Sequence, residues 1–480
     1  MKRKFLLTFS IIYSLNFSAF SQLEKTYKPA KIDTAIPLEM QAILKNKLFA
    51  QKDGAMRSSI KRETAKYKCE LYTDSYLTIN QQFADGKFML DTIFSSYLQI
   101  ISDQIYTANP QLKRETVIYA YRSAYPNAFS TSGGVLAFHL GLLSKMQNES
   151  QIAFIICHEL AHYHLKHIDQ KIDQLAELNF DKTLEKKINE VKKTGGNQYE
   201  KYKQLIESLT LDITKHSRSN EAEADSVALI YLLKTNYNPL EAIRVMDILK
   251  HCDDPHYIPP IDLKKHFDSK ELPFKDDWLI SDMPDFDYHK RKYEDSDTAS
   301  THPDCNKREA AMKRILADKQ APTLPKNTTL ERVMLQSDFE TIESLYYNHA
   351  VGQSLYYTLV LLEKYPDNAY LHAMVGKCFY TLYERQKNKE LGRVLDLPNS
   401  EFETNYNNLL QFIHALRLSE IAMLSNAYLE NRAIPFRTDE EFLYAMILCS
   451  KLPGAKNNTV ALIEEYKTKF PSGKYLNAFN

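Results

Sequence analysis

The stretch His158-Glu159-Leu160-Ala161-His162 constrains this chain more than any other part of its sequence. Residues four apart lie one turn above each other on a helix, so the two imidazoles can face one metal ion while Glu159 flanks a water molecule. Zinc lowers the pKa of such a water from about 16 to roughly 7, and a carboxylate beside it can pass the proton to a leaving amine. The motif therefore predicts a helix that carries two metal ligands and a general base.

The residues before the motif indicate that this helix is buried. Ile152, Ile155 and Ile156 lie around the preceding turn, so a helix over residues 151–165 would enter the core with its histidines facing inward. The alternative is a pair of core histidines bonded to backbone or carboxylate groups, because a chain of 480 residues with 14 histidines offers many pairs at this spacing. Spacing and burial together favour metal binding.

A third ligand is expected further along the chain, since a catalytic zinc ion usually takes three protein groups and keeps one position open. Glu221 and Asp225 lie near the start of an amphipathic helical stretch and share one face of it. One carboxylate can bind the ion while the other bonds the second nitrogen of a ligating histidine. Glu223 faces another way and is interpreted as a solvated surface charge.

Four ordered blocks make the chain resemble the M48 family of zinc metallopeptidases, the gluzincin group that includes the CAAX prenyl-protein peptidase, the membrane peptidase HtpX and soluble periplasmic members. The resemblance runs over roughly residues 85–315. The blocks are residues 127–135 (Asn-Ala-Phe-Ser-Thr-Ser-Gly-Gly-Val), the motif at 158–162 followed by His167, Glu221 with Asp225, and Thr301-His302-Pro303 with Arg308.

The resemblance implies one Zn²⁺ per chain and a role for each matching residue. His158, His162 and Glu221 would be the ligands, and Glu159 would be the base and proton shuttle. Asp225 would fix the tautomer of a ligating histidine.

The fourth block of the resemblance has two open interpretations. His302 is expected near the cleft as a catalytic residue that stabilises the oxyanion of the tetrahedral intermediate, with Arg308 in a supporting position. Both residues could instead be structural, because a lone His-Pro pair is typical of a loop.

Gly133-Gly134 followed by Val135 and an apolar run predicts a turn into a strand, and residues 117–121 predict a second strand of a small sheet beside the metal helix. In zincins an edge strand pairs with the extended substrate, so Gly133, Gly134 and Val135 are candidates for substrate binding; the alternative is a plain hairpin strand. The expected fold is mostly α: an α+β zincin core with this sheet, followed by a helical repeat domain.

Composition favours a soluble exported protein. The chain has 61 basic and 61 acidic residues, and nothing points to nucleic acid or to an anionic membrane surface. Lys2-Arg3-Lys4 and an apolar run up to residue 20 predict a signal peptide over residues 1–21, with no membrane span after its cleavage. The periplasm is the expected location and full secretion is the alternative. An uncleaved N-terminal anchor is disfavoured because the apolar run is short.

The peptidase domain is expected over residues 22–325 and contains two insertions. Residues 168–215 predict a charged helical hairpin. Residues 253–300 are rich in proline and aspartate and predict a long irregular segment, which could act as a lid over the active site. A histidine of this segment could reach the open zinc position, although ordinary loop histidines are the simpler interpretation; the candidates are His256, His266 and His289.

Residues 326–480 predict a helical domain that resembles a tetratricopeptide array. An apolar helix ends near Tyr365-Pro366-Asp367-Asn368, and a similar ending recurs at residues 466–473. The concave face of such an array suits peptides or an envelope assembly partner. Two functions stay open: a zinc endopeptidase that hydrolyses unfolded or misassembled exported proteins, and a periplasmic chaperone or assembly scaffold with a latent zinc site.

Overall fold

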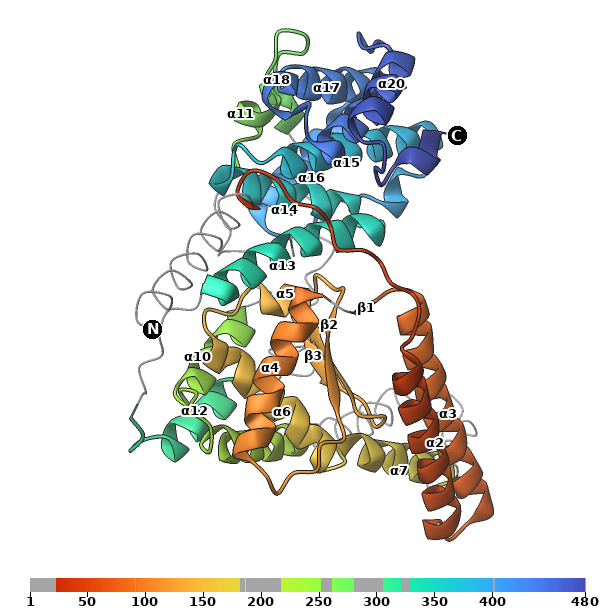
Figure 1. Cartoon of the computed structure of the whole chain (residues 1–480), viewed down its shortest axis with the longest axis vertical. Helices are drawn as coiled ribbons and strands as arrows, with labels where there is room; N and C mark the ends of the chain where they lie inside the picture. The colour runs from red at the N-terminus through yellow and green to blue at the C-terminus, as the bar shows by residue number, and fades with distance from the viewer. Residues whose placement is uncertain are drawn as a thin grey trace, which may run out of the picture. The chain divides into compact units, whose positions relative to one another are not determined.

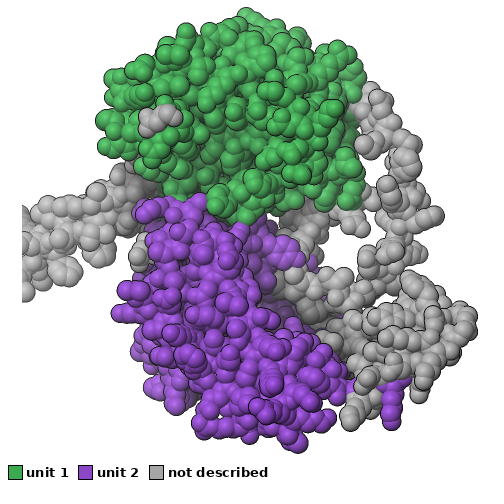
Figure 2. All heavy atoms as spheres, turned by 90° about the vertical axis from the view of Figure 1, so that its right-hand side faces the viewer, with its two compact units in different colours: residues 1–30, 254–291, 334–480 green, residues 31–253, 292–333 purple. Residues whose placement is uncertain are grey.

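The computed structural model describes residues 23–90, 92–181, 186, 217–251, 261–279, 305–320, 328–399 and 402–479. By their contacts the residues form two compact units (Figure 2). The sheet unit is Lys31–Asp253 with Lys292–Val333, and the helical unit is Met1–Ala30, Asp254–Arg291 and Met334–Asn480. The predicted signal peptide and the candidate His302 lie outside the described residues.

The sheet unit packs helices on both faces of a small sheet (Figure 1). Its helices are α2 (Leu38–Ser58), α3 (Arg62–Ala84), α4 (Ile93–Ala108), α5 (Leu140–Leu143), α6 (Glu149–His164), α7 (His167–Asn179), residues 217–232, α10 (Glu241–His251) and α12 (Cys305–Ile315). Helices α2 and α3 cover one face with Met40, Leu44 and Phe83, while α4 and α6 contact the strands from the other side. The prediction of a mostly α fold with a small sheet is confirmed.

The sheet has four strands in the order β1-β2-β4-β3, which are Phe88–Met89, Val117–Tyr121, Val135–His139 and Ala128–Ser130. Strand β2 is parallel to β4, and β3 is antiparallel to β4. The prediction that the strand after Gly133-Gly134 is an edge strand is wrong, because β4 pairs on both sides and all of it is buried. Its continuous apolar run is typical of a strand covered on both faces, and β3 is the half-buried edge beside it.

Local sequence explains where α6 begins and ends. The Asn148 side chain caps the helix by accepting a hydrogen bond from the Gln151 amide at 3.1 Å. Every residue from Ser150 to Ala161 is buried, as the run of isoleucines predicts. Lys166 then takes a left-handed conformation (φ 57°), which ends α6 and starts α7 at His167. This turn brings His167 back beside the last turn of α6. Most of the rest of the predicted hairpin lies outside the described residues.

The helical unit is built from consecutive helices that pack against one another. They are α11 (Leu263–Phe267), η2 (Asp276–Leu279), α13 (Thr328–Tyr347), α14 (Val351–Lys364), α15 (Ala369–Lys387), η3 (Leu391–Arg393), α16 (Thr404–Ala415), α17 (Leu418–Glu430), α18 (Ala433–Phe436), α19 (Glu440–Ser450), α20 (Thr459–Lys469) and η4 (Leu476–Phe479). Helix α15 is the centre of the unit and contacts α14, α17 and α19. No helix among the described residues is long and apolar enough to cross a bilayer.

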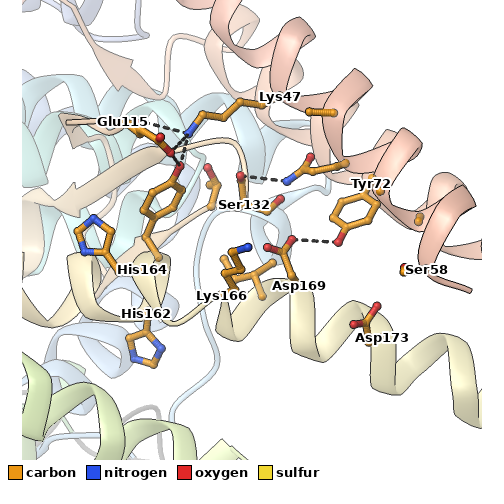
Figure 3. Close-up of a pocket in the computed structure, with 17 residues that line it drawn as sticks. Lys47, Ser58, Tyr72, Glu115, Ser132, His162, His164, Lys166, Asp169 and Asp173 are labelled. Carbon is orange, nitrogen blue, oxygen red and sulfur yellow. Dashed lines mark hydrogen bonds and ion pairs between the residues drawn. The ribbon is translucent and has the colours of Figure 1, made fainter. Parts of the chain in front are cut away.

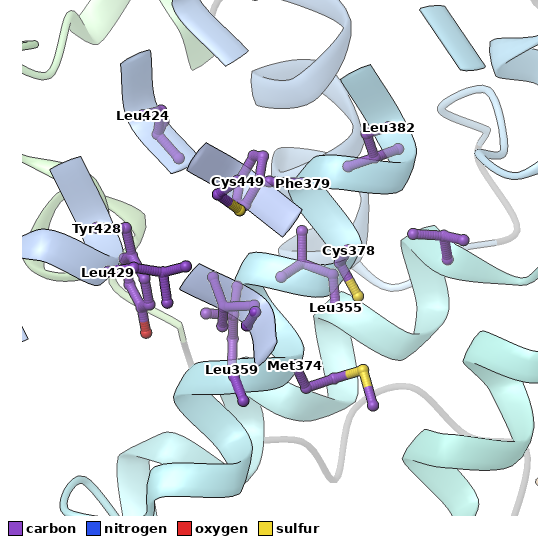
Figure 4. Packing of buried hydrophobic residues seen from close by; sticks show 14 of the residues in the cluster. Leu355, Leu359, Met374, Cys378, Phe379, Leu382, Leu424, Tyr428, Leu429 and Cys449 are labelled. Atoms are coloured by element: carbon purple, nitrogen blue, oxygen red, sulfur yellow. The ribbon is translucent and has the colours of Figure 1, made fainter. Parts of the chain in front are cut away.

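The core of the helical unit is filled by leucine, phenylalanine, methionine and cysteine side chains (Figure 4). At Gly376 of α15 an added Cβ would lie 2.7 Å from a methyl group of Leu429, so the glycine permits close approach of α15 and α17. The predicted turn between α14 and α15 is present: α14 ends at Lys364, and Asn368 caps α15 through the Leu371 amide at 3.1 Å. The repeat identity of the array stays a prediction.

Two segments pack with the helical unit although the predicted domains place them with the peptidase. The first is residues 23–30. The second is residues 261–279, whose apolar side chains belong to the helical core: Leu263, Phe267, Leu272, Phe274 and Trp278. In the same segment His266 contacts the Glu363 carboxylate at 2.8 Å. His266 thus has a partner within the helical unit, and the lid stays a prediction.

Below neutral pH, His372 of α15 should make the helical unit less stable. This imidazole contacts the Tyr428 hydroxyl at 2.7 Å and the Pro366 carbonyl at 2.8 Å, and chiefly burial lowers its pKa to about 4. An unfolded histidine titrates near pH 6.5, so between about pH 6.5 and 4 only the unfolded chain takes up the proton. Stability is complete above this window and is lost as the pH falls through it, by up to about 3 kcal/mol.

Denaturant unfolding at several pH values checks this expectation. A His372→Gln variant should show a flatter dependence on pH between 4 and 6.5, whereas the same measurement on the exposed His349→Asn control should match the parent chain. Equal pH dependence in the two variants would rule out His372 as the source.

Candidate metal centre

Three side chains from two helices converge in the sheet unit. His158 and His162 lie one turn apart on α6, with their Nε2 atoms 3.0 Å from each other. The Glu221 carboxylate, from the helix of residues 217–232, lies 3.4 Å from His158 Nε2 and 3.3 Å from His162 Nε2. The candidate ligand atoms of these residues all lie within 4.8 Å of one another. Two imidazole nitrogens and a carboxylate are the donor set of many catalytic zinc sites, so the geometry fits a zinc ion.

Asp225 and Arg308 lie directly behind the candidate ligands. Asp225 Oδ1 is 2.9 Å from His158 Nδ1, which leaves His158 Nε2 directed at the common centre. Arg308 of α12 donates to both Asp225 oxygens, at 2.7 and 2.8 Å, and its third nitrogen is 3.2 Å from Glu221 Oε2. All three side chains are at most one-quarter exposed. The arginine thus fixes the two carboxylates that orient and complete the site.

The electrostatics of this cluster favour a positive charge at its centre. Burial opposes a charge on His158, but the contacts with Asp225 and Glu221 outweigh it and raise the pKa of His158 to about 10. Burial likewise opposes the charge on Glu221, yet His158 and His162 hold the pKa of this carboxyl well below its usual range. A divalent cation would supply the same positive charge with the imidazoles deprotonated, as ligation requires.

Glu159 is placed as a general base would be. It follows His158 on α6, is 9% exposed, and its carboxylate makes no hydrogen bond or ion pair with the described part of the chain. A buried carboxylate without a partner beside a metal centre is available to a water molecule. The structure therefore brings Glu159 together with the three candidate ligands.

A second histidine, His167, contacts His162 on the side of the ring opposite the candidate ligand atom. His167 Nδ1 lies 2.8 Å from His162 Nδ1, and His167 Nε2 lies 3.4 Å from Glu223 Oε2. Burial and the neighbouring His162 lower the pKa of His167, which favours its neutral form, and a neutral His167 ring can accept a hydrogen bond from His162. The sequence pointed to His167 only through the family resemblance, and it predicted no contact for Glu223. The Glu223 side chain is 55% exposed, as predicted for a surface charge. The left-handed turn at Lys166, which no pattern signals, creates this contact.

A pocket of about 630 Å³ opens beside the metal centre (Figure 3). His162 forms part of its wall, and the other polar lining residues include Lys47, Tyr72, Glu115, Ser132 and Asp169. Lys47 donates to the Tyr163 hydroxyl and, at 3.0 Å, to the Glu115 carbonyl. Burial lowers the pKa of Lys47 and raises the pKa of Asp169. The pocket offers a partly polar space next to the ligand helix.

Gly133 and Gly134 lie at the edge of this pocket. Gly134 has φ +84°, and a Cβ there would lie 2.5 Å from the Glu115 carbonyl oxygen, so only glycine fits this turn. Val135 is fully buried, and its backbone amide and carbonyl bond to Thr131. Those two backbone groups are therefore occupied within the sheet unit. A role for Gly133, Gly134 and Val135 in substrate binding stays a prediction.

Metal-dependent hydrolases use an arrangement of this kind, in which one helix supplies a carboxylate and a second helix supplies two histidines and a glutamate. Residues 96–316 match the model of peptidase family M48, and this stretch contains every described residue of the centre. The resemblance of this part of the chain to peptidase family M48 is therefore confirmed.

Two curated relatives match smaller parts of the chain. The beta-barrel assembly-enhancing protease of Yersinia pestis is 21% identical over 196 residues, which is 39% of each protein. A protein of Vibrio cholerae serotype O1 to which the same name is provisionally given is 24% identical over 106 residues, 22% of each protein. The chain thus matches less than half of the length of either relative.

Proposed function

We propose that this protein is a zinc-dependent endopeptidase that hydrolyses unfolded or misassembled exported proteins. The observation that carries the proposal is the convergence of His158, His162 and Glu221 on one centre beside the unpartnered carboxylate of Glu159. His158 and His162 would hold the ion through Nε2 and Glu221 through its carboxylate. When bound, zinc would lower the pKa of a water molecule and polarise the scissile carbonyl.

The side chains around the centre would carry out the remaining steps of the reaction. Glu159 takes the proton of the attacking water and delivers it to the departing amine nitrogen. Asp225 holds His158 in the tautomer with the proton on Nδ1, and Arg308 holds Asp225. Because all three guanidinium nitrogens face carboxylates, Arg308 acts as a positioning residue here. His302 remains our candidate for stabilising the oxyanion.

Different observations support the proposed substrate class and the proposed location of the protein. The pocket beside His162 and the half-buried edge strand β3 give an extended polypeptide a place to lie next to the centre. The relatives are named for assembly of beta-barrel proteins, and the first 21 residues have the pattern of a signal peptide. We therefore place the protein in the periplasm, with the helical unit as the site that contacts an envelope assembly partner.

Removal of the metal tests this function. Cleavage of an unfolded protein such as casein should fall by at least about 10²-fold after treatment with a chelator, because water activation is lost, and it should return with Zn²⁺. Initial rates of peptide release measure the effect. A rate unchanged by chelation, in protein shown to be free of metal, would contradict the proposal.

A scaffold with a latent zinc site is the second candidate, because the helical unit forms a separate compact body of the chain. Complementation distinguishes the two functions. If a Glu159→Gln chain, expressed at the level of the parent, fully restores the phenotype of a deletion strain, the scaffold function is the relevant one. If it restores nothing, hydrolysis is required.

A further inference from the structure

The described chain begins with residues 23–30, which lie along the helical unit (Figure 1); Leu23 is helical, residues 24–25 form a turn, and residues 26–30 have no regular secondary structure. Its backbone makes the contacts at one end. The Leu23 carbonyl accepts a hydrogen bond from Asn368 Nδ2 at 2.9 Å, and the Lys25 carbonyl accepts one from the Ala369 amide at 2.7 Å. Ala369 is the first residue of α15, where helix amides lack partners within the helix. The backbone of the segment therefore satisfies two donors of the helical unit, whatever the side chains at these positions.

Tyr27 is the anchor of this segment. It is 5% exposed, stacks on Phe339 with ring centroids 4.8 Å apart, and meets the Tyr370 ring edge-on at 5.4 Å. Its hydroxyl donates to Glu340 Oε1 at 2.6 Å, and the Ala30 amide donates to the same oxygen at 2.5 Å. Glu340 is fully buried, so its carboxylate depends on donors of this kind. An aromatic environment with a buried hydrogen-bond acceptor at its base favours tyrosine over other side chains.

Two carboxylates lie at the edge of the groove, by which we mean the residues of the helical unit that contact residues 23–30. Thr26 donates to the Asp439 carboxylate, and Lys28 Nζ lies 4.0 Å from Glu440. Lys25 and Lys28 are otherwise exposed, so their side chains contribute mainly charge. Departure of the segment would uncover Phe339 and Tyr370, both of which are fully buried, and would remove donors from Glu340. The groove is therefore suited to being occupied at all times by a chain of this chemistry.

We propose that this groove is an exchangeable peptide-binding site, for which residues 23–30 are the tethered occupant. Its other occupant is a segment of another polypeptide that carries a tyrosine next to a lysine or arginine. Main-chain hydrogen bonds supply affinity regardless of sequence, and the tyrosine pocket supplies selectivity. This inference does not rest on the peptidase activity, because all of the groove belongs to the helical unit.

Competition between the tethered segment and a free peptide tests the proposal in the full chain. The probe is a fluorescein-labelled peptide with the sequence of residues 23–31, and binding is followed by anisotropy. A tethered occupant competes at an effective concentration on the order of millimolar, so a Tyr27→Ala chain should bind the peptide at least about tenfold more tightly than the intact chain. The matched control is Tyr347→Ala, because Tyr347 is 56% exposed on α13; it should bind like the intact chain.

Further measurements distinguish specific binding of the peptide from non-specific binding. In the Tyr27→Ala chain, a peptide with alanine in place of the tyrosine should bind at least about tenfold more weakly. A peptide of unrelated flanks that keeps only Thr-Tyr-Lys should compete, and an added Glu340→Gln substitution should weaken binding. The proposal is overturned if the folded Tyr27→Ala chain binds the peptide no better than the intact chain, or binds the tyrosine-free peptide equally well. Should Tyr27→Ala fail to fold, Tyr27→Phe, which loses only the bond to Glu340, decides in the same assay.

Discussion

A Glu159→Gln chain should hydrolyse unfolded protein about 10² to 10⁴-fold more slowly than the parent while it retains its zinc. Glutamine has the size of glutamate but cannot take a proton from the attacking water. The three candidate ligands are unchanged, so the metal content should be the same. Rates of casein cleavage and metal analysis of the same preparation measure the two quantities.

Glu177→Gln provides the matched control for this variant. Glu177 lies exposed on α7 in the same unit, so the same chemical change there should leave both the rate and the zinc content as in the parent. Substantial hydrolysis by Glu159→Gln would show that another group accepts the proton. Loss of zinc from that variant would instead show that Glu159 helps to hold the ion.

An Arg308→Met chain should be less stable than the parent by about 3–5 kcal/mol, the usual cost of leaving a buried charge without its partner. Arg308 is 7% exposed, and its guanidinium faces both Asp225 and Glu221. Its contact with Asp225, against the effect of burial, holds the pKa of this carboxyl below its usual range. With the arginine removed, Asp225 would no longer be fixed, and affinity for zinc should fall about 10 to 100-fold.

Denaturant unfolding of the metal-free chain and zinc titration measure these two effects. Arg314→Met is the control, because Arg314 lies on the same helix and, among the described residues, its guanidinium donates only to the exposed carbonyl of Ala310. We expect the control to change stability by less than about 0.5 kcal/mol. Equal effects of the two substitutions would mean that the Asp225 contact contributes little to either property.

The cluster of candidate metal ligands could be predicted from sequence because it depends on helical periodicity. His158 and His162 must share a face of α6, and Glu221 and Asp225 must share a face of their own helix, whatever the rest of the fold. That the two faces meet was inferred from the resemblance, and the distances between His158, His162 and Glu221 support it. Strand β2 was predicted at its observed bounds because its flanks and its β-branched and aromatic residues are distinctive.

Contacts that depend on tertiary pairing could not be predicted. Strand order follows from which strand lies beside β4, and the local pattern could not reveal that β3 would occupy the edge. The contact of His167 with His162 requires the left-handed turn at Lys166, a conformation that lysine rarely adopts. Residues 23–30 join the helical core through Tyr27, and residues 261–279 join it through five scattered apolar side chains; neither set carries a periodic signal.

X-ray absorption at the zinc edge of the purified protein tests the central claim most directly. We predict about one zinc ion per chain, bound by two imidazole nitrogens and a carboxylate oxygen at about 2.0–2.2 Å, with an affinity that drops sharply in Glu221→Ala and stays unchanged in the exposed control Glu177→Ala. Zinc without imidazole ligands, or an affinity that Glu221→Ala leaves intact, would contradict it.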